Sequence, residues 1–306
     1  MNRPAPPPSA PEASTEPIRL AAHGFAAELH REGATLARLD WRGRPLLRLS
    51  PDGPPSLASP NRFGLWPMVP FCNRAFGARM LDGAERIALP VNDPAMGACI
   101  HGFGWQAAWE VEKLADGEAV LVHRRAAGSD PYAYEARLRL RIAPGAARVS
   151  LAVTSRAARP LPFGVGLHPW FPAASDTTLT LAALGALALG PGYRARGLDP
   201  WPGGGPFAAG APVLSPRELA LGIVGWRGAA VLETPSAGLR LRLDASGNLR
   251  HPVLWTPPDA DFVCLEPQSH GLGAASEEAA RAVTPLARLA PGETLEGWME
   301  IGPEEL

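Results

Sequence analysis

The chain has 306 residues, with 29 Lys and Arg against 30 Asp and Glu, and 46% of its residues are hydrophobic. The apolar share is large enough for a globular core, and the net charge of −1 lacks the excess of Lys and Arg that marks nucleic-acid or polybasic membrane binding. We therefore expect a small-molecule partner, no nucleic acid and no membrane. Because the sequence shows neither a secretory signal nor a run of about 18 apolar residues, we expect a cytoplasmic protein.

Several common sites are excluded by residue spacing. The three cysteines, Cys72, Cys99 and Cys264, are odd in number and far apart, which fits neither a disulfide framework nor a Cys-x-x-Cys zinc site. The metalloprotease, serine-hydrolase and P-loop motifs are missing from the sequence. Residues 102–107 match a G-x-G-x-x-A dinucleotide pattern, but no amphipathic helix follows them, so we interpret the match as accidental. We expect no metal and no cofactor.

The pattern along the chain predicts strands. Residues 1–17 are rich in Pro, Ala, Ser and Glu and predict a flexible tail, followed by one domain over residues 18–306. Hydrophobic residues alternate with polar ones over 134–142, 149–153, 239–243, 286–289 and 295–301, and more weakly around a turn at 115–117. The Pro144-Gly145 pair between the first two of these runs predicts a hairpin with one solvated face.

Helical periodicity is almost missing. Only Ala274 to Val283 is Ala-rich with charged residues at helical spacing, and the Gly- and Pro-rich stretch Pro191 to Pro212 is interpreted as a long loop. Closely spaced strands without βαβ alternation predict an all-β protein, a large antiparallel β-sandwich with very little helix.

Four segments carry unusual residues between or at the ends of strands. They are Pro67-Met68-Val69-Pro70-Phe71-Cys72-Asn73-Arg74, Ile100-His101-Gly102-Phe103-Gly104-Trp105, Phe163-Gly164-Val165-Gly166-Leu167-His168-Pro169-Trp170-Phe171 and Phe262-Val263-Cys264-Leu265-Glu266-Pro267. Each His or Asn-Arg pair alone has an ordinary structural interpretation. Glu266 shares a strand face with Phe262 and Cys264, where a carboxylate requires a partner or a function. Together the four segments indicate a site.

In this order and at these spacings, the four segments resemble the aldose 1-epimerase (galactose mutarotase-like) family. The similarity runs from about Ile18 to Ile301. It implies the large sandwich of that family with a sugar cleft open on one sheet, and interconversion of the α and β anomers of a free aldose. The family pattern makes Glu266 the catalytic base and His168 the catalytic acid, with Asn73, Arg74 and His101 binding the sugar. Trp170 and Phe171 either stack on the sugar or belong to the core.

That chemistry suits these residue types. Ring opening takes a proton from the anomeric hydroxyl and gives one to the ring oxygen, and needs neither metal nor cofactor. A carboxylate whose pKa is raised by partial burial can serve as the base, and a His with its ordinary pKa of about 6.5 can serve as the acid. The planar guanidinium group of Arg holds several N–H donors in a fixed geometry, which suits hydrogen bonding to sugar oxygens.

One position departs from the family pattern. Many members carry an Asp that binds sugar hydroxyls, and Ala220 stands there in this sequence, with Glu218 nearby as a possible substitute. Two alternatives to a free-aldose epimerase stay open: a non-catalytic carbohydrate-binding protein, and a hexose-6-phosphate 1-epimerase that recognises phosphate through an additional Arg such as Arg79. A glycoside hydrolase usually needs two opposed carboxylates, and only Glu266 is nominated.

Overall fold

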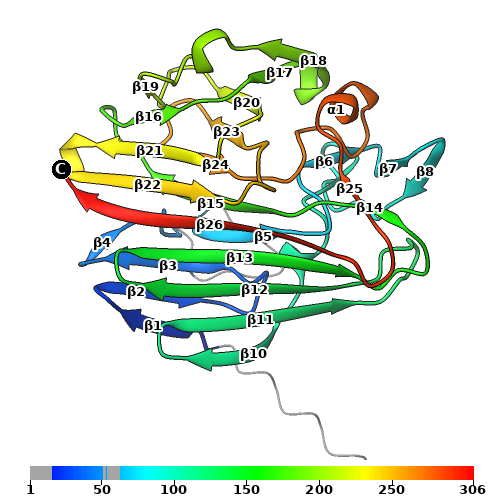
Figure 1. The fold of residues 1–306 in the computed structure, drawn as a ribbon, viewed down its shortest axis with the longest axis horizontal. Helices are drawn as coiled ribbons and strands as arrows, with labels where there is room; N and C mark the ends of the chain where they lie inside the picture. The colour runs from blue at the N-terminus through cyan, green and yellow to red at the C-terminus, as the bar shows by residue number, and fades with distance from the viewer. Residues whose placement is uncertain (1–15, 51–52, 54–62) are drawn as a thin grey trace, which may run out of the picture.

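The computed structural model of the chain describes residues 16–50, 53 and 63–306. The predicted tail therefore lies almost wholly outside the described residues. Two large antiparallel sheets are stacked face to face, with the nine-stranded sheet in front of the larger one in Figure 1. In the described part of the chain, no helix has the length and apolar character that crossing a bilayer requires.

The eleven-stranded sheet carries the strands of the four unusual segments at its centre. In spatial order its strands are β1 (Ile18–Ala22), β2 (Phe25–Leu29), β3 (Leu36–Trp41), β5 (Leu65–Met68), β15 (Gly166–Pro172), β24 (Phe262–Glu266), β23 (Val253–Thr256), β20 (Leu219–Val224), β17 (Gly185–Leu189) and β18 (Ala195–Pro200), and β4 (Arg44–Pro45) also pairs with β3.

The nine-stranded sheet contains the predicted hairpin. In spatial order its strands are β10 (Glu110–Ala115), β11 (Glu118–Arg125), β12 (Tyr134–Ala143), β13 (Ala146–Ser155), β26 (Thr294–Glu305), β22 (Leu239–Ala245), β21 (Ala229–Thr234), β16 (Thr178–Leu181) and β19 (Ala211–Pro212). The period-two segments in this sheet therefore form strands as predicted, including β10 and β11 around the 115–117 turn.

Short elements complete the fold. They are the pairs β14 (Leu161–Phe163) with β25 (Ala287–Leu289), β6 (Arg74–Phe76) with β9 (Ala98–Ile100) and β7 (Arg79–Asp82) with β8 (Glu85–Ala88), the 3₁₀ turns η1 (Gly104–Gln106), η2 (Pro191–Tyr193), η3 (Pro202–Gly204) and η4 (Pro235–Ala237), and the helix α1 (Glu278–Val283).

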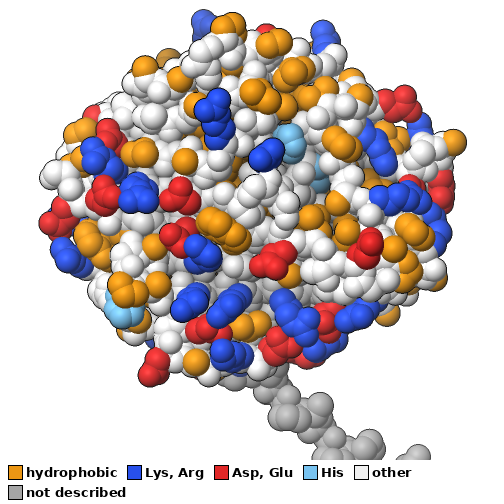
Figure 2. Space-filling view, in the orientation of Figure 1, with side chains coloured by type: hydrophobic (Ala, Val, Ile, Leu, Met, Phe, Trp, Pro, Cys, Tyr) orange, Lys and Arg blue, Asp and Glu red, His pale blue; other side chains and the backbone are white. Residues whose placement is uncertain are grey.

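The outer face of the nine-stranded sheet is solvated, as its alternation predicts. Along β12 every second side chain is buried, and Arg137 on the outer side pairs with Glu112 and Glu135. Acidic and basic side chains are mixed over the face seen in Figure 2, which is the side of this sheet. A mixed surface of this kind offers no concentrated field for a polyanion.

Two sequence-based interpretations need correction. The stretch 191–212 is not a plain loop, because β18 pairs with β17 at the edge of the sheet, where Gly and Pro are tolerated. The helix is shorter than residues 274–283. Its predicted first turn is lost because the Ala275 carbonyl accepts a hydrogen bond from the Leu81 amide at 2.8 Å, and Ala274 and Ala275 are buried.

The centre of the larger sheet is buried on both faces. Along β15 and β24, side chains such as Leu167 and Leu265 belong to the core between the sheets, and the alternate residues point to the opposite face. That opposite face is nevertheless buried, because η1 packs on β5 and the chain around Gly102 bridges to Val69 just beyond β5. The fold therefore places a covered pocket on the outer side of this sheet.

Candidate active site

His168 and Glu266 lie opposite each other on neighbouring strands. Trp170 of β15 pairs with Cys264 of β24, so the residues two positions away on each strand, His168 and Glu266, share the same face. The Nε2 atom of His168 lies 3.3 Å from Oε1 of Glu266. The two residues are only 6% and 3% exposed, so this contact is largely shielded from solvent.

Indole rings fix the plane of the His168 imidazole. The ring stacks on Trp66 with a centroid distance of 4.2 Å, and on Trp170 at 5.4 Å with an interplanar angle of 12°. His101 meets the same imidazole edge-on at 5.3 Å. Because rotation about its side-chain bonds would break these contacts, the Nε2 atom of His168 is held toward Glu266.

Gln268, which the sequence analysis did not nominate, orients Glu266. Its Nε2 donates a hydrogen bond to Oε2 of Glu266 at 3.0 Å, and its Oε1 accepts one from Nδ2 of Asn73. Gln268 is fully buried, so these hydrogen bonds meet little competition from water. Gln268 stands two residues after Glu266. Because side chains of an extended chain alternate between the two faces, the side chains of Glu266 and Gln268 lie on the same face.

Asn73 and His101 are positioned by each other. The backbone N–H of Asn73 donates to Nδ1 of His101 at 3.2 Å, and the backbone N–H of His101 donates to the backbone carbonyl of Asn73 at 2.9 Å. Gly102 follows with φ +68°, and a Cβ there would lie 2.3 Å from the Val69 carbonyl oxygen. The His-Gly-x-Gly segment thus needs glycine to pack its loop onto Val69, in the connection between β5 and β6 that carries Asn73, which explains the motif without a nucleotide.

Arg74 lies at the more open side of the pocket. Its Nε donates to Oδ2 of Asp93 at 3.1 Å, and its side chain is 31% exposed. The guanidinium carbon also lies 5.8 Å from the centre of the Tyr193 ring. The remaining guanidinium N–H groups can donate hydrogen bonds to a ligand, while the hydrogen bond to Asp93 restrains the guanidinium group.

These residues surround a cavity of about 430 Å³. The five sequence-nominated residues all line it, together with Trp66, Asn92, Asp93, Trp105, Trp170, Tyr193, Ala220, Val253, Trp255 and Leu272, among others. Its volume falls in the range of small-molecule sites. Phe171 belongs to the core, so of the two aromatic residues left open by sequence only Trp170 faces the pocket. Arg79 is exposed on β7 and is not a lining residue.

Burial shifts the proton affinities of the facing pair in opposite directions. It raises the pKa of Glu266 to about 8, although the Gln268 hydrogen bond and the charge of Arg74 act to lower it. It lowers the pKa of His168 to about 3. The direction for Glu266 agrees with the sequence argument. For His168 the ordinary pKa does not apply, and burial favours the uncharged form of both groups, the neutral imidazole and the protonated carboxyl.

Cys264 completes a group with possible metal ligands. Its Sγ and the ligand atoms of His168 and Glu266 all lie within 4.8 Å of one another. Metal binding requires a thiolate, however, and burial raises the pKa of Cys264 well above its usual value. Because the neutral thiol is a weak ligand, the group fits proton transfer better than metal binding.

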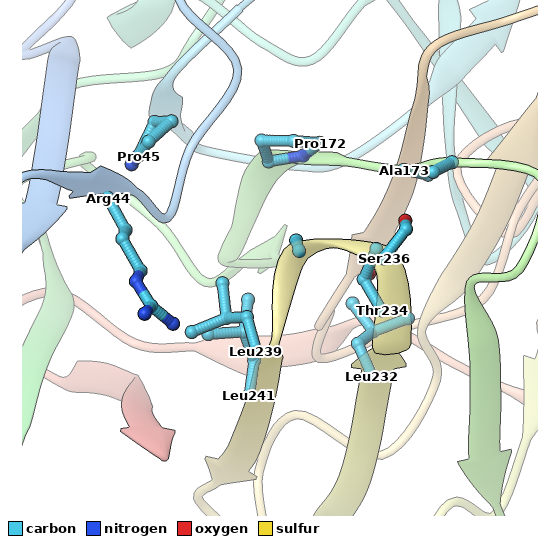
Figure 3. A pocket seen from close by; sticks show the side chains of 11 residues that line it. Arg44, Pro45, Pro172, Ala173, Leu232, Thr234, Ser236, Leu239 and Leu241 are labelled. Atoms are coloured by element: carbon cyan, nitrogen blue, oxygen red, sulfur yellow. The ribbon is translucent and has the colours of Figure 1, made fainter. Parts of the chain in front are cut away.

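A second cavity lies elsewhere and has a different character. Its volume is about 310 Å³, and Figure 3 shows Arg44 and Pro45, Pro172 and Ala173, and Leu239 and Leu241 around it. Among the described residues that line it, Arg44 is the only titratable one, and Arg44 donates a hydrogen bond to the Gly238 carbonyl. This cavity lacks the means for acid–base chemistry, and the pocket containing His168 and Glu266 is the candidate active site.

The sequence matches the family model described as aldose 1-epimerase over residues 16–302. The chain belongs to the aldose 1-epimerase family. The Escherichia coli K12 protein YphB, which is uncharacterized, is 29% identical over 250 residues, covering 79% of this chain and 84% of YphB.

Solved structures of similar proteins share the fold. An Escherichia coli K12 protein provisionally assigned as an aldose 1-epimerase has a TM-score of 0.83 and 26% identity, covering 95% of this chain and 99% of that one. A galactose mutarotase-like protein from Clostridium acetobutylicum has a TM-score of 0.80 and 20% identity, covering 95% of both chains. Galactose 1-epimerase from Lactobacillus acidophilus NCFM has a TM-score of 0.74 and 19% identity, covering 94% of both chains. The predicted galactose mutarotase-like sandwich is confirmed.

Proposed function

We propose that the protein is an aldose 1-epimerase that interconverts the α and β anomers of a free aldose. The observation that carries this proposal is the buried contact of 3.3 Å between Nε2 of His168 and Oε1 of Glu266. A pair that holds one proton supplies one acceptor and one donor at the same place. Anomer exchange needs both at once, for the anomeric hydroxyl and for the ring oxygen.

The protons balance over one ring opening. The proton on Glu266 passes to Nε2 of His168 and from there to the ring oxygen, as the bond between C1 and the ring oxygen breaks. Glu266 takes the proton of the anomeric hydroxyl, whose oxygen becomes the aldehyde oxygen. The pair ends with the proton again on Glu266. Rotation of the aldehyde followed by the reverse transfers closes the ring on its other face.

The surrounding residues are proposed to hold the sugar for this reaction. Asn73, Arg74 and His101 present N–H groups along one wall of the pocket, and the indole of Trp170 offers a flat apolar face. Correct placement of the ring oxygen near His168 and of the anomeric oxygen near Glu266 lowers the entropic part of the barrier. In this account the binding residues and the acid–base pair are distinct groups.

Anomer-exchange NMR tests the proposal. Purified protein is added to equilibrated free hexoses, pentoses and hexose 6-phosphates, and the exchange rate between anomers is compared with the rate in buffer alone. We expect acceleration of at least one free aldose. A protein that binds a sugar but leaves every exchange rate at the uncatalysed value would instead be a carbohydrate-binding protein, and a preference confined to phosphorylated sugars would make it a hexose-6-phosphate 1-epimerase.

A further inference from the structure

The two sides of the pocket differ in chemistry. On one side stand Asn73, Arg74 and His101, with Asp93 beside Arg74. On the opposite side of Glu266, the neighbouring strands β23 and β20 place apolar residues at the paired positions. Val253 of β23 pairs with Glu266, and Gly222 of β20 pairs with Val253.

The next row of the sheet is equally apolar. Trp255 pairs with Cys264, and Ala220 pairs with Trp255. Leu272 covers Gly222, since a Cβ at that glycine would lie 3.3 Å from Cβ of Leu272. We call this side of the pocket the apolar wall; it consists of Ala220, Val253, Trp255 and Leu272. None of these four side chains accepts a hydrogen bond.

Glu218 does not replace the missing acceptor at Ala220. Its Oε1 accepts hydrogen bonds from the Tyr193 hydroxyl at 2.5 Å and from Nε1 of Trp255 at 2.9 Å. Glu218 is exposed and is not a lining residue of the cavity, whereas Ala220 is. The carboxylate of Glu218 therefore fixes two aromatic rings, and Ala220 itself lines the cavity.

A sugar hydroxyl against this wall would leave water without finding a hydrogen-bond acceptor on any of the four side chains. Leaving a buried hydroxyl unpaired costs about tenfold or more in affinity, whereas a C–H or methyl group loses nothing at an apolar surface. We propose that the substrate is a deoxyaldose whose hydroxyl-free edge lies on the apolar wall, and that Ala220 is the residue that sets this preference. This inference rests on the proposed epimerase function and names the substrate class for it.

Matched sugar pairs test the inference. The pairs are 2-deoxy-D-glucose with D-glucose, 2-deoxy-D-galactose with D-galactose, L-fucose with L-galactose, and L-rhamnose with L-mannose. For each sugar, kcat/KM for anomer exchange is divided by its uncatalysed rate constant. We expect the deoxy member of at least one pair to be favoured by about 10- to 100-fold, the range over which an apolar pocket discriminates against an added hydroxyl.

Variants at position 220 attribute the preference to that residue. In the favoured pair, Ala220→Asp should shift the ratio toward the hydroxylated sugar by about tenfold or more, because the new carboxylate accepts from the hydroxyl. Ala220→Asn supplies an acceptor without a charge near Glu266, and should shift the ratio in the same direction. Ala21→Asp, at an exposed position of β1, is the matched control and should leave the ratio unchanged. Because the ratio for the same two sugars is compared between wild type and variant, the difference in intrinsic reactivity between the sugars cancels.

The outcomes separate the two proposals. Faster exchange of the hydroxylated member in every pair, or a ratio that neither Ala220 variant moves, overturns the inference and leaves the epimerase function standing. A wild-type protein that accelerates no sugar of the panel overturns both. If Ala220→Asp does not fold, the wild-type ratios and Ala220→Asn decide.

Discussion

Replacing Gln268 with Met should move the alkaline limb of the pH–rate profile. Gln268 donates to Oε2 of Glu266 at 3.0 Å, and this bond favours the carboxylate form. A buried hydrogen bond to a charged group contributes about 1.5–3 kcal/mol. At about 1.4 kcal/mol per pKa unit, its loss raises the pKa of Glu266 by about one to two units. The pair then keeps its proton to higher pH, so a limb governed by a pKa of about 8 shifts upward by that amount.

The assay is anomer exchange on the best sugar from pH 5 to pH 10.5. Gln106→Met is the matched control, because Gln106 lies near the pocket and its side-chain oxygen accepts a hydrogen bond from Asn92 rather than contacting Glu266. Its alkaline limb should coincide with that of wild type. A Gln268→Met profile with reduced rate but an unshifted limb would refute the reasoning, since it would show that Gln268 acts on packing alone.

Three further predictions concern binding, metal and stability. Arg74→Ala should raise KM as well as lower kcat, with kcat/KM reduced by about 10- to 100-fold in steady-state exchange, because its N–H groups are proposed to bind the sugar in the ground state and in the transition state. Activity should survive exhaustive chelation and dialysis, since Cys264 is held as a thiol; activity that is lost and then restored by one metal would contradict this. Glu266→Gln should be stabilising at high pH. The Glu266 carboxyl has a pKa of about 8 in the folded protein against 4.5 ordinarily, so the stability of the wild-type protein falls as the pH rises between these two values. Gln does not titrate, so the variant lacks this loss. From pH 6 to pH 9 the difference in unfolding free energy should grow by about 3 kcal/mol in urea denaturation, and a constant difference would contradict the raised pKa.

Strands in which hydrophobic and polar residues alternate could be predicted from the sequence. The edge strand β18 and the short length of helix α1 could not, because both depend on contacts with distant parts of the chain. The run from Tyr134 to Ile142 has one wet face, and its period of two is visible in the residues alone. Strand β18 lacks that signal, because its place at the sheet edge rather than its composition makes it a strand. Helix α1 is short for a similar reason, since Leu81 takes the Ala275 carbonyl from a distant part of the chain.

The nominated residues of the site share one pocket, but their chemistry depends on burial. Motif order brought Glu266, His168, Asn73, Arg74 and His101 into consideration, and all five line the cavity. The imidazole of His168 stacks on Trp170 of its own strand and on Trp66 of β5, and burial lowers its pKa; the contact with Trp66, about 100 residues away in the chain, is not visible in the residues around His168. Their roles in binding and proton transfer stay predictions.

Anomer-exchange NMR of the acid–base variants at pH 7 tests the central claim most directly. Glu266→Gln and His168→Asn nearly preserve shape and polarity, and sugar affinity is measured alongside by calorimetry. If the two residues transfer protons, each variant should slow exchange by about 10²–10⁴-fold while sugar affinity changes far less. Exchange by either variant at the wild-type rate, with the sugar bound equally well, would contradict the assignment of His168 and Glu266 as the acid–base pair.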